Sequence, residues 1–213
     1  MQSGNGTLIL EFDGLCAPAG RGAVAAYGWL IRRGAAVVNS GSGTHPVRIP
    51  HGYGPAGHRA EYHGLIEGLQ AVIQVRRPAE PLTVRGDARL VIRQMAGLWC
   101  AVGPALAPSY RQACELTRPL YPVTFVLVAP EHNAAADALA RAACRTALEV
   151  ERRARAVEVH VERVSGGRYR ANGKYDVDST AGTCTCPDYI NLCHRFHARC
   201  KHLFALEGHT LDE

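Results

Sequence analysis

Four residues near the C-terminus have the types and the spacing of a zinc site. Cys184 and Cys186 form a C-x-C pair, and after thirteen further residues Cys200 and His202 form a C-x-H pair. Zinc takes four sulfur or nitrogen ligands in a tetrahedron, and two close pairs separated by a loop supply them with little loss of chain entropy. We therefore predict a structural Zn²⁺ ion held by Cys184, Cys186, Cys200 and His202.

Other ligand choices stay open in the same segment. Cys193, His194 and His197 lie between the two pairs, and any of them can replace Cys200 or His202 or be a polar surface residue. A disulfide cluster or buried thiols without a metal are the alternatives to zinc. Close pairing beside a histidine is more typical of metal ligands.

Four acidic residues farther upstream favour a metal of a different kind. We expect Asp13 to close a first strand, Glu61 to lie in the first turns of a helix, Asp87 to follow a strand and Asp137 to begin a last helix. Each alone has an ordinary explanation as a turn or helix-surface residue. Together they would repel one another unless cations neutralised them, and hard oxygen ligands select Mg²⁺ or Mn²⁺. Two such ions can drive phosphodiester hydrolysis.

The elements that must position these acids follow from the hydrophobic periodicity. Strands are expected over residues 7–12, 23–31, 36–40, 81–85 and 123–129, and helices over 59–75, 88–98, 108–120 and 134–155. The segment between the third strand and the first helix, rich in Gly, Pro and His, is expected to be a loop. This order predicts an α/β fold with a mixed sheet and helices on its faces, in which strand ends and helix starts meet at one edge.

Length and composition predict two domains. The chain has 213 residues with 47% hydrophobic content, enough for a domain of about 140 residues and a small metal-stabilised one. We expect a catalytic domain over 1–145, a helical connector over 146–156 and a zinc module over 157–213. No leader and no apolar run long enough for a membrane span is present, so a cytoplasmic protein without membrane contact is expected.

Charge and the remaining cysteines add weaker expectations. The first 145 residues carry 14 arginines against 9 acids, whereas the rest carries 10 basic and 10 acidic residues. This surplus is compatible with a polyanionic partner but is also common in proteins that do not bind nucleic acid. Reducing conditions suit cysteines used as ligands. The other four are expected to be ordinary buried thiols: Cys16, Cys100, Cys114 and Cys144.

The C-terminal motif resembles a known module. The run YDVDSTAGTCTCPD over 175–188, followed by CKHLFA over 200–205, resembles a SWIM zinc finger, and the resemblance covers about residues 157–207. It implies a small ββα unit that binds nucleic acid or protein and is usually appended to another domain.

The upstream motifs resemble type 1 ribonuclease H over about residues 7–144. They read FDGLC around Asp13, AEY around Glu61, GDxxLVIxQ after the fourth strand, and NxxADxLA around Asp137. The resemblance implies a ribonuclease H-like fold and cleavage of the RNA strand in RNA/DNA hybrids. It also implies that Asp13, Glu61, Asp87 and Asp137 are catalytic carboxylates that bind two Mg²⁺ or Mn²⁺ ions.

Departures from the family pattern concern substrate contacts. The family's Thr-Asn-Asn reads Ala-Gly-His58 here, its Ser after the third carboxylate is Ala88, and an expected Arg is Pro130. The resemblance implies that those family residues hold the hybrid across its minor groove, where the 2′-hydroxyl marks RNA. We hypothesise that His58 and Arg59, or the zinc finger, supply substitute contacts. A basic helix used by some members is lacking, because residues 99–108 contain no Lys or Arg.

Retention of all four acids favours an active enzyme. The predicted function is a metal-dependent endonuclease for RNA/DNA hybrids, with a zinc finger that assists nucleic-acid binding or binds a protein partner. The alternatives are a non-catalytic nucleic-acid-binding protein on a ribonuclease H-like scaffold, and a nuclease for another RNA substrate. His132 is expected to be a surface residue; the alternative that the resemblance implies is the mobile histidine with which some ribonucleases H assist product release.

Overall fold

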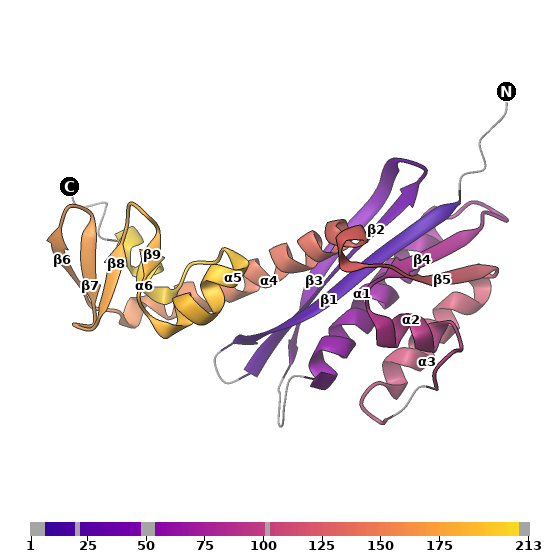
Figure 1. Cartoon of the computed structure of the whole chain (residues 1–213), viewed down its shortest axis with the longest axis horizontal. Helices are drawn as coiled ribbons and strands as arrows, with labels where there is room; N and C mark the ends of the chain where they lie inside the picture. Colours follow the sequence, from indigo (N-terminus) through magenta and orange to yellow (C-terminus); the bar gives the residue numbers. More distant parts are fainter. Residues whose placement is uncertain (1–6, 20–21, 48–53, 101–102, 209–213) are drawn as a thin grey trace. The chain divides into compact units, whose positions relative to one another are not determined.

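The computed structural model describes residues 7–19, 22–47, 54–100 and 103–208 (Figure 1). The chain divides into two compact units, Met1–Cys144 and Arg145–Glu213. Within the described part of the chain, no helix is both long enough and apolar enough to cross a membrane.

The first unit is built on a five-stranded mixed sheet. Its strands are β1 (Leu8–Ala19), β2 (Gly22–Arg33), β3 (Ala36–Val47), β4 (Leu82–Gly86) and β5 (Val123–Leu127). The strand order is β3-β2-β1-β4-β5. Strands β1, β2 and β3 pair antiparallel, whereas β4 pairs parallel with both β1 and β5.

Four helices cover this sheet or continue from it. They are α1 (Gly54–Val75), α2 (Arg89–Met95), α3 (Ala107–Thr117) and α4 (Ala134–Ala154), with 3₁₀ turns at Arg118–Leu120 and Pro130–His132. Figure 1 shows α1, α2 and α3 together on one side of the sheet. The predicted α/β class, with a mixed sheet and helices on its faces, is confirmed.

The two faces of β1 differ in chemistry because successive side chains alternate. Leu8, Leu10 and Phe12 are fully buried in the main hydrophobic core beside α1 residues such as Tyr62. The alternating residues Ile9, Glu11 and Asp13 point to the opposite face, and two of these three are acidic. Of these, Glu11 is buried and pairs with Arg32 and Arg85, with N···O distances of 3.0 and 3.7 Å. The apolar face therefore packs the helices, and the other face carries charge.

The expected end of the first strand and the expected start of the first helix were both wrong, and both elements carry acids of the site. Strand β1 does not end at Asp13 but runs on to Ala19, because its antiparallel pairing with β2 continues through Asp13↔Gly28 and Gly14↔Tyr27. Helix α1 begins at Gly54, so Glu61 lies in its third turn. Proline fits the first turn of a helix, where its missing N–H has no intrahelical acceptor, so the Gly- and Pro-containing stretch did not have to be a loop. Residues 48–53 of that expected loop lie outside the described residues.

The second unit contains a small antiparallel sheet of four strands. They are β6 (Val161–Ser165), β7 (Arg168–Ala171), β8 (Tyr175–Asp178) and β9 (Thr183–Cys184), in the order β6-β7-β8-β9. Asn172 and Gly173, with φ of 52° and 64°, form the β7–β8 turn in the left-handed conformation that tight hairpins require. The resemblance implied two strands, and this unit has four.

Helical segments complete the second unit after the last strand. A π-helical turn covers Tyr189–Cys193, α5 covers His194–Phe196, α6 covers Lys201–Ala205, and 3₁₀ turns lie at Ala156–Glu158 and Leu206–Gly208. The core of this unit contains apolar residues from the sheet, such as Val177, and from α6, such as Leu203, packed with four buried cysteines.

The cysteines of the first unit are not uniformly buried. Cys144 is buried and Cys16 and Cys114 are half-buried, but Cys100 is exposed. The expectation of a buried thiol was therefore wrong for Cys100. It follows α2 after the left-handed Gly97, at which the chain leaves the helix.

Candidate metal centres

Close backbone packing brings α1 and α4 to the sheet on either side of Asp13. A Cβ atom added to Gly14 would lie 2.2 Å from the backbone nitrogen of Glu61, and one added to Gly28 would lie 2.6 Å from the carbonyl oxygen of Ala136. Gly28 is the cross-strand partner of Asp13, so its Cα substituent points to the same face, whereas that of Gly14 points to the opposite one. Only glycine permits this double approach, which carries Glu61 and the start of α4 to β1.

The third acid reaches the same place through parallel strand pairing. The β1–β4 register runs from Leu8↔Leu82 to Glu11↔Arg85, and two more residues in each strand place Asp87 beside Asp13. Asn133, only 2% exposed, donates from Nδ2 to Asp87 Oδ1 at 2.7 Å and to the Phe12 carbonyl at 3.0 Å. The loop before α4 is thus tied to the middle of β1 and to the residue that follows β4.

The charges of the other three acids all act on Asp13. Burial, followed by the charge of Asp87, raises the pKa of Asp13 to about 7. The pKa of about 7 also includes a lowering by the 2.8 Å hydrogen bond from the Gly14 amide to Asp13 Oδ1 and smaller increases from Asp137 and Glu61. Burial also raises the pKa of Glu61. A divalent cation bound by these oxygen donors would relieve the repulsion that acts on Asp13.

Two basic side chains at this cluster were not assigned to it from the sequence. His58 Nδ1 lies 2.9 Å from Glu61 Oε2, and Arg141 Nε donates to both carboxylate oxygens of Asp137 at 2.8 and 2.7 Å. His58 and Glu61 are three residues apart on α1, and Asp137 and Arg141 are four residues apart on α4. Side chains at these spacings lie on the same face of a helix, so both contacts could have been predicted from the sequence. His58 therefore contacts an acid of the cluster, and its hypothesised contact with the hybrid stays a prediction.

Two further residues with suggested roles lie elsewhere. Arg59 Nε donates to the Ala105 carbonyl at 3.2 Å, so this guanidinium is engaged with the α2–α3 connection. His132 is exposed in the 3₁₀ turn Pro130–His132, where the sequence predicted a surface residue.

The structure brings the two outer C-terminal pairs together. One ligand atom from each of Cys184, Cys186, Cys200 and His202 lies within 4.8 Å of the others, and all four residues are buried. The distance from Cys184 Sγ to His202 Nδ1 is 3.5 Å. A tetrahedral zinc ion with bonds of about 2.3 Å to sulfur and about 2.0 Å to nitrogen would separate those atoms by about 3.5 Å. The cluster has the dimensions of a zinc site.

The sulfur atoms also receive the hydrogen bonds that favour thiolates. The amide of Cys186 donates to Cys184 Sγ at 3.4 Å, and the amide of Tyr189 donates to Cys186 Sγ at 3.3 Å. Hydrogen bonds from the neighbouring Cys184 and Cys200 thiols lower the pKa of Cys186, whereas the hydrogen bond with Cys186 raises the pKa of Cys184, so that without a metal the three sulfur atoms share protons. The Nε2 atom of His202 is buried without a hydrogen-bond partner in the described part of the chain, and the ring packs 5.0 Å from that of Tyr175.

The three alternative ligands are placed outside this group. Cys193 is fully buried, but its Sγ donates to Asp188 Oδ2 at 3.5 Å instead. His194 packs edge-on against Tyr189, and His197 ends α5 with a φ of 52°. The outer pairs are therefore the set whose geometry suits one ion.

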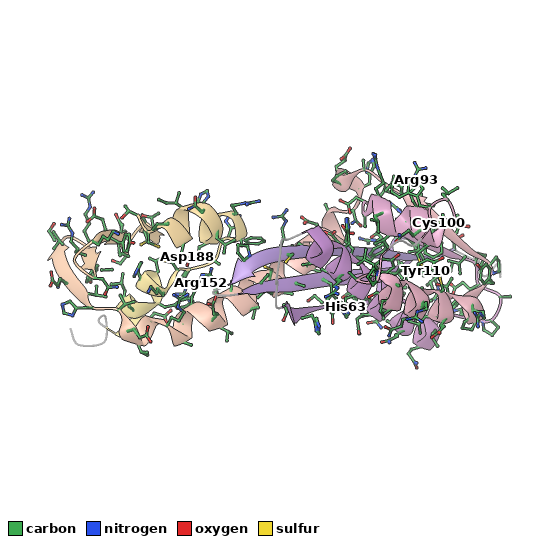
Figure 2. All side chains as sticks on the ribbon, turned by 90° about the horizontal axis from the view of Figure 1, so that it is seen from below. His63, Arg93, Cys100, Tyr110, Arg152 and Asp188 are labelled. Carbon is green, nitrogen blue, oxygen red and sulfur yellow. The ribbon has the colours of Figure 1, made fainter. Side chains whose placement is uncertain are left out.

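A buried arginine holds the loop that follows the C-x-C pair. Arg152 Nε and Nη2 donate to the two carboxylate oxygens of Asp188 at 2.8 and 2.7 Å, and Nη1 donates to the Leu148 carbonyl at 3.1 Å (Figure 2). The Arg152 side chain is 4% exposed. This fork fixes the residue two positions after Cys186 to the C-terminal part of α4.

The sheet order, the helices and the position of the acids define a ribonuclease H-like first unit. Residues 11–143 match the model of the family described as reverse transcriptase-like, and the chain belongs to this family. The family match ends at residue 143, so the SWIM resemblance of the second unit stays a prediction.

Two solved structures with this fold have sequence identities to this chain of 26% and 30%. The N-terminal ribonuclease H domain of Rv2228c from Mycobacterium tuberculosis is 26% identical, with a TM-score of 0.57 over 68% of this chain and 97% of that one. Ribonuclease H1 from Halobacterium salinarum is 30% identical, with a TM-score of 0.54 over 65% and 97%. LC11 ribonuclease H1 in complex with RNA/DNA hybrid, at 24% identity and a TM-score of 0.57 over 67% of this chain and 99% of that one, shares the fold.

Among curated proteins, the bifunctional protein Rv2228c of M. tuberculosis and the uncharacterised protein Mb2253c of Mycobacterium bovis are each 34% identical over 90 residues. That match covers 42% of this chain and 24% of either relative. The similarity thus spans about a quarter of the length of these relatives.

Proposed function

We propose that this protein is a ribonuclease H that hydrolyses the RNA strand of RNA/DNA hybrids with two Mg²⁺ or Mn²⁺ ions. Asp13, Glu61, Asp87 and Asp137 would hold the ions. The observation that carries the proposal is the convergence of these acids, which together with burial raises the pKa of Asp13 to about 7. The names of the relatives, which include ribonucleases H and one complex with a hybrid, support the substrate.

The residues of this chain supply a rigid frame for the reaction. When bound, two divalent ions activate a water molecule and stabilise the leaving oxygen of a phosphodiester. The Gly14 amide fixes one oxygen of Asp13, and Asn133 fixes one oxygen of Asp87. Because these donors are in place before substrate arrives, little reorganisation is required when it binds.

For the second unit we propose structural Zn²⁺ bound by Cys184, Cys186, Cys200 and His202, in a SWIM-type finger that adds a nucleic-acid contact. A tethered second contact raises the affinity of a catalytic domain whose own substrate residues are reduced in number. The proposed boundaries are 1–145 for the catalytic domain, 146–156 for a helical connector and 157–213 for the finger. Buried thiol ligands suit the reducing conditions of the cytoplasm, where we place the protein.

The test is cleavage of strand-labelled RNA/DNA hybrid, RNA duplex and single strands with Mg²⁺ or Mn²⁺. We expect cleavage of the RNA strand of the hybrid, and a loss of about a hundredfold or more for Asp87→Asn, which removes one liganding charge at nearly constant shape. Glu115→Gln, the same chemical change on the exposed face of α3, is the matched control with unchanged activity. Cleavage that survives in Asp87→Asn contradicts the mechanism.

The same experiment separates the alternatives. Cleavage of RNA duplex in preference to hybrid would identify another RNA substrate, in keeping with Ala88 and Pro130 at positions where the family has polar groove residues. Hybrid binding without cleavage under either metal would identify a non-catalytic scaffold.

A further inference from the structure

The imidazole of His58 lies directly against one of the proposed catalytic carboxylates, that of Glu61. His58 and Glu61 are one turn apart on α1, and their side chains meet with 2.9 Å between Nδ1 and Oε2. The side chain of His58 is 40% exposed and that of Glu61 is 19% exposed, so the histidine lies at the rim of the cluster within reach of solvent and solutes. This position carries an amide in the family pattern that the sequence resembles, so the nitrogen base is a departure of this chain.

The distance between His58 Nδ1 and Glu61 Oε2 suits a hydrogen bond, and it also suits two atoms that bind the same metal ion. Two neighbouring ligands at about 2.1 Å from an octahedral ion are separated by about 3 Å, the edge of the octahedron. The Nδ1···Oε2 distance of 2.9 Å matches this edge. An ion held by Glu61 would therefore have His58 as a ready neighbouring ligand after little side-chain movement.

We propose that His58 adds a nitrogen ligand to the carboxylate site and thereby biases it toward Mn²⁺ over Mg²⁺. The inference rests on the proposed function, because it assigns His58 to the metal ions of that site. Mg²⁺ prefers oxygen ligands and keeps its waters, whereas a first-row transition metal gains from imidazole. A site of carboxylates alone lacks this source of discrimination.

The experiment measures metal binding to the zinc-loaded chain of 213 residues, independently of cleavage. Mn²⁺ is titrated and the loss of the electron paramagnetic resonance signal of free aqueous Mn²⁺ gives the affinity, and Mg²⁺ competition gives the affinity for Mg²⁺. Spin-echo modulation of bound Mn²⁺ reports a coordinated ¹⁴N nucleus. The variants are His58→Ala and His58→Asn, and His160→Ala is the control because that histidine is 75% exposed and belongs to the second unit.

We expect the ¹⁴N coupling in the wild type and in His160→Ala, and its loss in both His58 variants. The affinity for Mn²⁺ should fall about tenfold in both, as for loss of one metal-orienting group, while the affinity for Mg²⁺ changes less than about threefold. His58→Asn retains an N–H that can donate to Glu61 but has no imidazole. It therefore separates metal ligation from positioning of the carboxylate.

Each other outcome has a distinct meaning. Mn²⁺ bound without ¹⁴N coupling in the wild type, or full Mn²⁺ affinity in His58→Asn, overturns the role of His58 and leaves the carboxylate site intact. Equal losses for Mn²⁺ and Mg²⁺ in His58→Ala also overturn it, since positioning alone would produce them. Failure of the wild type to bind either ion overturns the proposed catalytic site itself.

Discussion

Replacing Asp13 by Asn should make the metal-free protein more stable while abolishing its activity. Asp13 lies partly buried among three other acids, and burial and their charges raise its pKa from 3.8 to about 7. An acid whose pKa is higher in the folded than in the unfolded state binds protons more tightly when folded. Its contribution to stability is therefore fully present below about pH 4 and is lost as the pH rises through about 7.

The magnitude follows from the size of that rise. One pKa unit corresponds to about 1.4 kcal/mol, so the ionised carboxylate destabilises the fold by about 4 kcal/mol at pH 8 relative to an unperturbed acid. Asparagine has no charge to bury, and its side-chain oxygen can still accept the hydrogen bond from the Gly14 amide. For a domain of this size, about 4 kcal/mol raises the melting temperature by about 10 °C.

The assay is urea unfolding of both proteins at pH 5 and pH 8, without added Mg²⁺ or Mn²⁺ and without chelators, so that zinc is retained. The stabilisation by Asp13→Asn should be clear at pH 8, smaller at pH 5, and reduced at pH 8 by Mg²⁺, which binds the wild type. Glu115→Gln on α3 controls for the change from carboxyl to amide. Equal stability of wild type and Asp13→Asn across this pH range would refute the electrostatic reasoning.

Three further predictions concern zinc and buried polar contacts. Cys200→Ser should reduce bound zinc, measured by elemental analysis, from one ion to none. It should also weaken hybrid binding in a gel-shift assay, while the cleavage rate at saturating hybrid is retained. Unchanged zinc content would contradict the ligand set. In urea unfolding, Asp188→Ala should destabilise the second unit by about 3 kcal/mol, because it leaves Arg152, which is 4% exposed, without its counter-charge. Arg152→Met should cost only about 1 to 2 kcal/mol, because the Asp188 that it leaves unpaired is 41% exposed and can be hydrated. A larger cost for Arg152→Met than for Asp188→Ala would show that burial does not govern this pair. Tyr62→Phe should cost about 1 to 3 kcal/mol, since the fully buried hydroxyl donates to Gln94 Oε1 at 2.6 Å and its loss leaves that oxygen unpaired; an unchanged unfolding midpoint would mean that water replaces the hydroxyl.

The order of elements in the first unit was predictable because the hydrophobic period is strong. The alternation in β1 and the helical spacing of Leu65, Leu69 and Val72 in α1 reflect burial in one core. The ends of these elements were less predictable, because tertiary pairing overrode local turn chemistry. Asp13-Gly14 is a favourable turn sequence, yet in β1 the glycine serves the close approach of α1.

The candidate sites were predictable in residue type but not in their supporting contacts. The four acids and the two outer zinc pairs carry their own spacing signals, whereas the connections made by Asn133 and Arg152 join segments 46 and 36 residues apart. Single-sequence periodicity contains no information on such long-range hydrogen bonds. The contact between His58 and Glu61 was the exception, because its i,i+3 spacing is local.

The two proposed metal centres differ in how they relate to folding. The acid cluster is assembled by an extensive apolar core and by glycines at backbone contacts, and its charges oppose the fold that holds them. The cysteine and histidine cluster instead forms much of the core of a small unit, where Cys184, Cys186 and Cys200 pack with few large apolar side chains. A small core of this kind relies on its ion for stability. Gradual removal of metal should therefore unfold the second unit first, while the first unit loses its catalytic ions and stays folded.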